Sequence, residues 1–333
     1  MSSIPTIEFG VPGDKVRIPR IGLGATAMSY LYGPFDDDES VKVLNHSIDI
    51  GCNFLDTADM YGLGHNEKLI SRVLKVRRKD VFLCSKFGIM TREPLPGETG
   101  VFTKYNIGTN GSPEYMRRCI EASLERLGTD YIDLYYLHDR DPNVPIEETV
   151  AAMAELVKEG KVRYLGLSNC SADDLRRAYK VHPIAAVQNK YSAWFTKVEQ
   201  DGILDACREL GVTFVAFTPL GRGFLTGEIR SANDLPKDDW RLNRPIYKPE
   251  IIEDNVKLVD ATEAIAKKHG CTPSQLALAW LLAQYDNLVV LPGTKRIKHL
   301  EENCAAGHIK LSDEEVKEIR KFVDCANIEG IRF

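Results

Sequence analysis

The sequence contains no apolar run approaching the roughly 20 residues that a helix needs to cross a bilayer. Its first residues, 1–6, lack the basic segment followed by an apolar one that is typical of a secretory signal peptide. Basic residues are in the minority, with 43 Lys and Arg against 48 Asp and Glu. The resulting net charge of −5 gives no general affinity for nucleic acid. We therefore expect neither a membrane protein nor a nucleic-acid-binding one.

Several motifs of other enzyme classes are also absent. No GxSxG elbow and no HExxH helix occurs, and no tyrosine is followed four residues later by lysine, the pair of short-chain dehydrogenases. The histidines show no metal-ligand spacing and the eight cysteines form no CxxC pair, so we expect neither a metal site nor a disulfide framework. Scattered cysteines in a chain of this length indicate buried thiols in a reducing compartment, and the cytoplasm is the expected location.

What the sequence does contain is the composition of an ordinary globular protein, with 44% hydrophobic and 27% charged residues. A length of 333 residues permits more than one domain. No low-complexity segment or linker divides the chain, however, so we expect a single domain over residues 1–333. The longest irregular stretch is 221–250, and loops of that length in a compact domain are usually functional. The segment 88–112 is polar and rich in glycine, and we expect a second long loop there.

Short apolar strand patterns alternate with helical patterns along the chain. Eight strands separated by helices select either a closed (β/α)₈ TIM barrel or an open doubly wound sheet. An N-terminal β-hairpin is expected over 6–18, and two extra C-terminal helices over 298–306 and 312–326. The expected strands cover 20–23, 53–56, 81–86, 132–137, 162–168, 185–189, 213–218 and 288–291, and the helices between them 40–51, 66–74, 112–127, 146–159, 172–181, 200–210, 255–269 and 273–283.

A glycine-rich segment at 22–27 matches the GxGxxA pattern of dinucleotide-binding open sheets. In those sheets a helix begins directly at the glycines. Here residues 29–34 carry turn signals instead. The pattern therefore gives little support to the open sheet, and the barrel is the preferred interpretation.

Ionisable side chains follow the early strands at their carboxyl ends. Asp56 ends one strand, Tyr61 lies in the turn after it, Lys86 ends the next, and His138 follows the strand over 132–137. The carboxyl ends of barrel strands meet at one rim, where active sites lie. Asp56 is costly to bury without a cationic partner, and Lys86 supplies one. The sequence therefore predicts that these side chains meet.

The chemistry of such a group would be acid catalysis. A positive charge near a phenol favours the phenolate, so Lys86 would make Tyr61 a better proton donor to a carbonyl oxygen that gains negative charge. His138 could hydrogen-bond that oxygen or the phenol. Each residue also has a structural alternative when taken singly. Asp56 could be a helix cap, Lys86 a rim lysine, Tyr61 a packing residue and His138 a core histidine.

The motifs around these residues resemble the signature of the aldo-keto reductases. The pattern is Gly51-x-Asn-Phe-x-Asp-Thr-Ala-Asp-x-Tyr-Gly-x-Gly-x-Asn-Glu67, and matching segments follow at 85–88, 131–138, 160–169, 219–223 and 292–295. The resemblance runs from about residue 15 to 325. The phrases at 142–149 and 224–227 are similar to a branch of the family found in microbes and plants.

This resemblance implies a (β/α)₈ barrel that binds NADPH in extended form, without a Rossmann domain, and reduces aldehydes or ketones. Tyr61 is then the proton donor, Lys86 and Asp56 tune it, and His138 orients the carbonyl. The implied cofactor-binding residues are Ser168, Asn169 and Gln188 at the nicotinamide carboxamide, Phe217 at the nicotinamide ring, Leu220, Gly221 and Arg222 over the pyrophosphate, Gly293, Thr294, Lys295 and His299 near the adenosine phosphate, and Glu302 and Asn303 at the adenine.

Two of these positions depart from the family pattern. Phe217 stands where a tyrosine is usual, which keeps the stacking face of the ring and loses only the hydroxyl. His299 stands where many relatives carry an arginine against the 2′-phosphate. Lys295, Arg296 and Lys298 still supply positive charge there, so NADPH is favoured over NADH.

The substrate pocket is expected among the loops at the same rim, with Met28, Tyr30, Phe87 and Trp194 as candidates. An aromatic lining suits hydrophobic or aryl aldehydes better than free sugars. Two other functions stay open. One is an NADPH-binding redox-sensing regulatory subunit similar to the potassium-channel β subunits, and the other is a specialised pyridoxal reductase. The oligomeric state has no sequence signal, and the expected partner is a small carbonyl compound.

Overall fold

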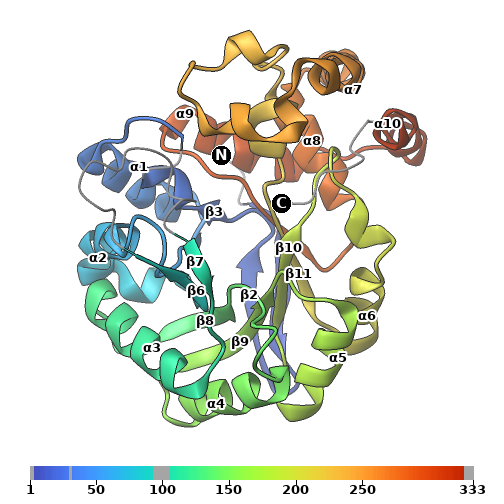
Figure 1. Cartoon of the computed structure of the whole chain (residues 1–333). Coiled ribbons are helices and arrows are strands. Elements are labelled where there is room, and N and C mark those ends of the chain that lie inside the picture. The colour runs from blue at the N-terminus through green and yellow to red at the C-terminus, as the bar shows by residue number, and fades with distance from the viewer. Residues whose placement is uncertain (1–3, 30–31, 93–105, 326–333) are drawn as a thin grey trace.

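Eight parallel strands form the centre of the molecule, in a computed structural model that describes residues 4–29, 32–92 and 106–325. They lie in the order β12-β11-β10-β9-β8-β5-β4-β3, and Figure 1 shows the helices arranged around them. The expected (β/α)₈ barrel is confirmed, whereas the single domain over 1–333 stays a prediction. The strands are β3 (Leu23–Gly24), β4 (Phe54–Asp56), β5 (Phe82–Phe87), β8 (Ile132–Leu137), β9 (Val162–Ser168), β10 (Ala186–Lys190), β11 (Thr213–Phe217) and β12 (Leu288–Leu291).

The sheet closes on itself between its first and last strands. The nitrogen of Gly22 donates to the carbonyl of Val290 at 3.0 Å, and the nitrogen of Val290 donates to the carbonyl of Arg20 at 2.9 Å. Gly22 is needed at this seam, because a Cβ there would lie 2.8 Å from the side chains of Leu291 and Phe54. The sequence predicts this strand over 20–23. Regular pairing with β4 covers only Leu23–Gly24, which is β3.

The helices follow the expected pattern, with boundaries shifted by a few residues. The largest shift is at α7, which begins at Pro249 rather than at 255 because a proline suits the first helical position. Two helices, α9 and α10, follow the last strand as expected, and α10 packs against α7. The helices are α1 (Asp37–Asp49), α2 (His65–Arg77), α3 (Pro113–Leu127), α4 (Ile146–Lys158), α5 (Ala172–Val181), α6 (Ile203–Leu210), α7 (Pro249–His269), α8 (Pro273–Leu282), α9 (Ile297–Ala305) and α10 (Asp313–Asp324).

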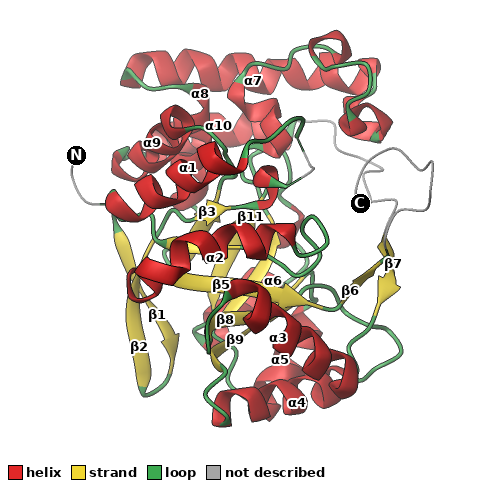
Figure 2. Cartoon of the chain, turned by 90° about the vertical axis from the view of Figure 1, so that its left-hand side faces the viewer, coloured by secondary structure: helices red, strands yellow, loops and turns green. Residues whose placement is uncertain are grey.

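The segment 88–112 differs from the expected loop. Its described parts contain two short antiparallel strands, β6 (Ile89–Thr91) and β7 (Asn106–Thr109), which project from the barrel in Figure 2. Most residues of β7 are exposed, so the strand follows from pairing with β6 and not from burial of an apolar face. A sequence pattern based on burial could not identify such a strand.

The N-terminal hairpin closes one end of the barrel. It consists of β1 (Thr6–Val11) and β2 (Asp14–Pro19), and it crosses the centre of the ring in Figure 1. Phe9 is fully buried, with its ring 5.2 Å from that of Phe82 and 5.4 Å from that of Tyr164. Because Phe82 begins β5, the hairpin covers the amino ends of the strands. The carboxyl ends are left for a site.

None of the helices in the described part of the chain is long and apolar enough to span a bilayer.

The hairpin contact gives the first prediction. Phe9→Ala removes a fully buried ring from this end of the barrel, and truncations of that kind cost about 3–5 kcal/mol. Urea unfolding should show a loss of that size. Val16→Ala on the same hairpin removes a partly buried side chain and should cost clearly less. Equal losses of unfolding free energy for the two variants would contradict the inference that Phe9 closes this end of the barrel.

Candidate active site

A buried ion pair lies at the carboxyl ends of β4 and β5. The Nζ of Lys86 contacts Oδ1 of Asp56 and donates to the backbone carbonyl of Thr57 at 2.8 Å. Lys86 is fully buried and Asp56 is 3% exposed. Each side chain extends from the last part of its strand into the barrel mouth, and neighbouring parallel strands bring the two together. The cationic partner that Asp56 required is therefore in place.

Lys86 keeps its charge because Asp56 compensates for the effect of burial. Burial acts to lower the pKa of Lys86, but the adjacent Asp56 carboxylate outweighs this effect and the pKa is raised. The second carboxylate oxygen of Asp56 accepts a hydrogen bond of 2.8 Å from Nε2 of Gln188 on β10. Lys86 is consequently a fixed ammonium ion at the mouth of the barrel.

Tyr61 and His138 lie beside this ammonium. The hydroxyl of Tyr61 is 3.5 Å from Nζ of Lys86, and its ring centroid is 5.1 Å from the same nitrogen. The ring of His138 meets that of Tyr61 edge-on, at 5.8 Å between centroids and 81° between planes. The backbone nitrogen of His138 donates to the carbonyl of Phe87 at 2.7 Å, which continues the pairing of β5 with β8. The four side chains thus form one cluster.

His138 is a neutral imidazole. Burial lowers its pKa well below the usual value, and the positive charge of Lys86 acts in the same direction. Its Nδ1 is buried and makes no hydrogen bond in the described structure. A neutral imidazole beside a phenol and an ammonium can donate a hydrogen bond to an oxygen atom without adding a second positive charge.

This cluster opens into a large cavity of about 850 Å³. Asp56, Tyr61 and His138 line it at the barrel mouth. From there it runs past β11 and β12 to the start of α9. Of the residues implied to bind the cofactor, those lining the cavity are Ser168, Gln188, Phe217, Leu220, Arg222, Gly293, Thr294, Lys295, His299, Glu302 and Asn303.

Two of the implied cofactor residues do not line this cavity. Asn169 is exposed, and its side-chain nitrogen donates to the backbone carbonyl of His138 at 3.4 Å. Gly221 lines a smaller side pocket next to the cavity. Its φ of +58° belongs to the left-handed region, where glycine is favoured.

The far end of the cavity is suited to phosphate groups. Lys295, Arg296 and Lys298 line it at the start of α9. Three further basic side chains, Arg222, Arg241 and Arg244, line the cavity beside the rings of Trp240 and Tyr32. The helix α9 begins in its wall, and its N-cap, Arg296, gives no side-chain hydrogen bond to the first turn. Free backbone N–H groups and the helix dipole favour an anion there. In size and charge the cavity fits a dinucleotide phosphate.

Lys295 and His299 have contacts that the sequence did not indicate. The ammonium of Lys295 donates to the carbonyl of Tyr32 at 2.8 Å and also contacts the carbonyl of Pro34. It therefore connects the segment after β12 to the loop after β3. Nδ1 of His299 lies 3.6 Å from a carboxylate oxygen of Glu302, one turn along α9.

The expected substrate-pocket residues have different locations. Met28 and Phe87 are fully buried in the core, where Phe87 stacks on Tyr135 at 5.2 Å, and neither lines the cavity. Trp194 lines the side pocket and stacks on Phe224 at 3.8 Å. Tyr30 lies outside the described residues. The sequence did not indicate the side chains that do line the cavity near Tyr61, which are Tyr32, Met60, Ile89 and Trp240.

The longest irregular stretch, 221–250, supplies part of this wall. The ring of Trp240 meets that of Tyr32 at 5.8 Å, and the guanidinium of Arg241 lies 5.6 Å from the Tyr32 ring centroid. Nη1 of Arg241 also donates to the carbonyl of Arg222 at 2.9 Å. This stretch therefore lines the cavity, although no sequence pattern singled out Trp240.

Lys190, at the end of β10, lines the side pocket together with Phe195, Thr218 and Arg222. Burial lowers the pKa of Lys190 to about 6, and Arg222 and Arg244 act in the same direction. Thr218 and Arg222 also line the main cavity, so the two hollows adjoin. Burial and the two arginines therefore disfavour a further positive charge at Lys190.

In residues 4–29, 32–92 and 106–325, no group of three or more His, Cys, Asp or Glu is placed to hold a metal ion.

Comparison with known proteins identifies the family of this chain. A family description, "Aldo/keto reductase family", matches residues 20–324. The chain is 44% identical to aldo-keto reductase yakc [NADP(+)] of Schizosaccharomyces pombe, over 99% of this chain and 95% of that protein. It also resembles the glycerol dehydrogenase AKR11B4 from Gluconobacter oxydans, with 27% identity, a TM-score of 0.84 and 98% and 97% of the two chains covered. An aldo/keto reductase from Klebsiella pneumoniae, solved with NADP and acetate, is 27% identical with a TM-score of 0.71. That match covers 95% of this chain and 96% of the other.

The buried pair gives a prediction on stability. Asp56→Asn leaves the Lys86 ammonium buried without its counter-charge, and breaking a buried pair costs about 3–5 kcal/mol. Urea unfolding should show that loss. Glu155→Gln breaks an exposed pair with Lys158 at 2.7 Å and should cost little. The prediction is wrong if the two variants lose the same stability.

Lys190 gives a prediction on pH. Its folded pKa of about 6 lies below the ordinary 10.5, so the charged form is disfavoured by folding. The resulting cost is complete below pH 6 and shrinks as the pH rises toward 10.5. Lys190→Met should therefore raise the melting temperature more at pH 6 than at pH 9. Lys75→Met, at an exposed position of α2, should give the same small change at both. A pH-independent gain for Lys190→Met would contradict the shift.

Proposed function

Because the chain belongs to the aldo-keto reductase family, we propose that it reduces aldehydes and ketones to alcohols with Tyr61 as the proton donor. The chain is an NADP-dependent oxidoreductase, as its similarity to an NADP(+) aldo-keto reductase and to a reductase solved with NADP indicates. The observation that carries the role of Tyr61 is its hydroxyl, which lies 3.5 Å from a fully buried ammonium at the wall of the large cavity.

The proton transfer depends on the neighbours of that hydroxyl. As a carbonyl carbon is reduced, its oxygen gains negative charge and requires a proton. The Lys86 ammonium stabilises the phenolate that Tyr61 becomes when it gives up its proton. Asp56 holds the ammonium in place and keeps it charged, as the raised pKa of Lys86 reflects. The cofactor supplies the hydride when bound.

His138 has a different role in this proposal. As a neutral imidazole next to the Tyr61 ring, it donates a hydrogen bond to the carbonyl oxygen and fixes the direction from which the phenol approaches. Its low pKa prevents a second cation from competing with Lys86. Orientation of this kind holds the carbonyl oxygen and the phenol close to the geometry in which the proton is transferred.

The cofactor would be held along the cavity wall. Ser168 and Gln188 offer polar groups near the tetrad, and Phe217 offers an aromatic face at the end of β11. We propose Asn169 as a further ligand only if its amide turns from the carbonyl of His138. At the far end, Arg296 and Lys298 at the start of α9 supply the positive charge that a 2′-phosphate requires.

The substrate class follows from the wall nearest to Tyr61. Met60, Ile89, Tyr32 and Trp240 present apolar and aromatic surface there. Such a lining favours hydrophobic or aryl aldehydes over free sugars. Met28 and Phe87 are replaced in this role because both are in the core. We also propose a reducing compartment such as the cytoplasm, since all eight cysteines are free thiols.

Tyr61→Phe keeps the ring and removes only the transferable proton. We expect a loss of nearly all turnover of 4-nitrobenzaldehyde, by about a hundred-fold or more, because a positioned general acid contributes 10²–10⁴-fold. The dissociation constant of NADPH, measured by fluorescence, should stay close to that of the wild type. Tyr179→Phe, a matched loss of a hydroxyl on α5, should keep full turnover.

A comparable rate in Tyr61→Phe would show that the acid is assigned to the wrong residue. A carbonyl panel that includes pyridoxal tests the substrate class with the same assay. Very slow turnover on every aldehyde would favour the redox-sensing alternative. A marked preference for pyridoxal would favour the specialised reductase.

A further inference from the structure

A series of side-chain hydrogen bonds leads away from the buried tetrad. It begins at Thr57, whose carbonyl accepts the hydrogen bond from Lys86 at 2.8 Å. Oγ1 of Thr57 donates to Oδ1 of Asn66 at 2.6 Å, and Nδ2 of Asn66 donates to Oγ of Ser29 at 2.9 Å. Thr57 and Asn66 are fully buried and Ser29 is 1% exposed, so water does not compete for these contacts.

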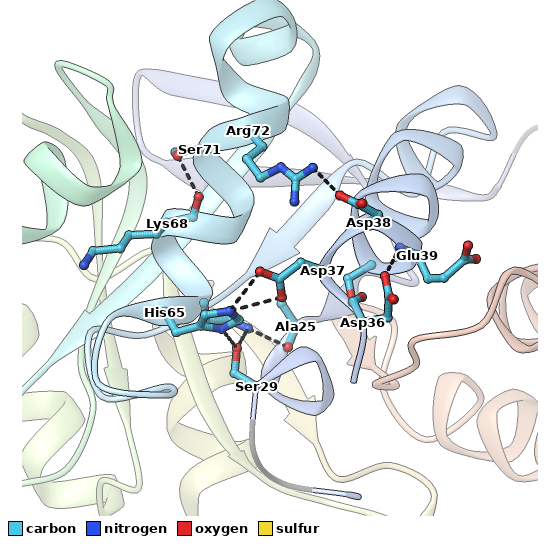
Figure 3. A network of polar contacts seen from close by, with 12 residues as sticks. Ala25, Ser29, Asp36, Asp37, Asp38, Glu39, His65, Lys68, Ser71 and Arg72 are labelled. Carbon is cyan, nitrogen blue, oxygen red and sulfur yellow. Dashed lines mark hydrogen bonds and ion pairs between the residues drawn. The ribbon is translucent and has the colours of Figure 1, made fainter. Parts of the chain in front are cut away.

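The series continues to the outside of the barrel, as Figure 3 shows. Oγ of Ser29 is 2.8 Å from Nδ1 of His65, and Nε2 of His65 is 3.2 Å from Oδ2 of Asp37. Since Asn66 already donates to Ser29, the serine hydroxyl can donate to Nδ1 of His65 in the tautomer that carries its proton on Nε2. The Nε2–H of that imidazole then donates to the carboxylate. Each side chain of the series then donates a hydrogen bond to the next one, from Thr57 to Asp37.

Ser29, His65 and Asp37 have the residue types of a hydrolase triad, but their surroundings exclude that chemistry. Ser29 is almost fully buried, and its oxygen accepts a hydrogen bond from Asn66. A nucleophile needs a substrate carbon within reach of that oxygen. The arrangement is therefore a support and not a second reaction centre.

Asn66 connects the segments that follow the neighbouring strands β3 and β4 at the barrel mouth. Its Nδ2 also donates to the carbonyl of Ala25 at 2.9 Å, and Ala25 precedes the cavity-lining residues Thr26 and Ala27. Its backbone nitrogen donates to the carbonyl of Tyr61 at 3.2 Å. The side chain and the backbone of this one residue thus connect the loop after β3, the end of β4 and the turn that carries the phenol.

We propose that Ser29, His65 and Asn66 are positioning residues for the reduction, which act through Thr57 and the Tyr61 turn to hold the phenol hydroxyl at its distance from the Lys86 ammonium. This inference rests on the proposed function. A proton donor gains from such support because small displacements of the reacting group are costly in rate.

The test compares Ser29→Ala with Ser29→Thr. The alanine removes the hydroxyl at the middle of the series, and kcat for 4-nitrobenzaldehyde should fall by about ten-fold. The dissociation constant of NADPH should not change, because none of the three positioning residues lines the cavity. Threonine keeps the hydroxyl and should restore most of the rate. The matched control is Arg72→Ala, which breaks an exposed ion pair of 2.5 Å with Asp38 between the same two helices (Figure 3).

A role in stability alone would lower the melting temperature and the number of NADPH sites per chain, while kcat per site stayed at the wild-type value. That outcome, or a ten-fold loss in Arg72→Ala, overturns the inference. If Ser29→Ala does not fold, His65→Gln is measured in the same way. The double variant Ser29→Ala with His65→Gln should lose no more rate than either single variant, because both break one series. Additive losses would contradict this.

Failure of this inference is distinguishable from failure of the proposed function. Normal kcat in Ser29→Ala together with an inactive Tyr61→Phe would remove only the positioning role. An active Tyr61→Phe would remove the proposed proton donor itself.

Discussion

The ion pair between Lys86 and Asp56 is the constraint on which the rest of the site depends. An ammonium that is fully buried at the end of a strand is tolerated only next to a carboxylate. The pairing of β4 with β5 places that carboxylate within reach. Once the pair is fixed, its positive charge acts on its neighbours. Burial lowers the pKa of His138, and the charge of Lys86 acts in the same direction. The hydroxyl of Tyr61 lies 3.5 Å from the same ammonium nitrogen.

The two ends of the barrel that holds this pair differ in structure. At the amino ends of the strands, the hairpin inserts Phe9 against Phe82 and closes the core. At the carboxyl ends, loops from β3, β5 and β11 surround a cavity with aromatic and basic side chains in its wall. Basic groups lie both beside Trp240 and at the start of α9. Such a wall fits a ligand that carries both aromatic rings and phosphates. Burial lowers the pKa of Lys190 in the adjoining side pocket, and Arg222 and Arg244 act in the same direction.

Support for the reacting group extends beyond the residues that touch the cavity. Asn66 holds the Tyr61 turn and the loop of Ala25, and the hydrogen bonds from Ser29 to Asp37 anchor it to two outer helices. A rigid strand fixes Lys86, but Tyr61 lies in a turn whose position must be set by such contacts. His65 and Asp37, at the starts of α2 and α1, do not line the cavity, so the positioning that we propose acts only through these contacts.

The sequence by itself determined the alternation of strands and helices, the closed barrel, and the four ionisable residues at one rim. The reason is geometric, because parallel strands bring all their carboxyl ends to one side whatever the loops do. The tertiary structure alone decided which loop side chains face the cavity. Met28 lies in the core while Met60 lines the wall, and nothing in their local patterns distinguishes them. It also decided the exposed pairing of β6 with β7 and the contact of Ser29 with His65, residues 36 positions apart. Side-chain direction in a loop depends on packing against distant segments, and a local pattern carries no record of that packing.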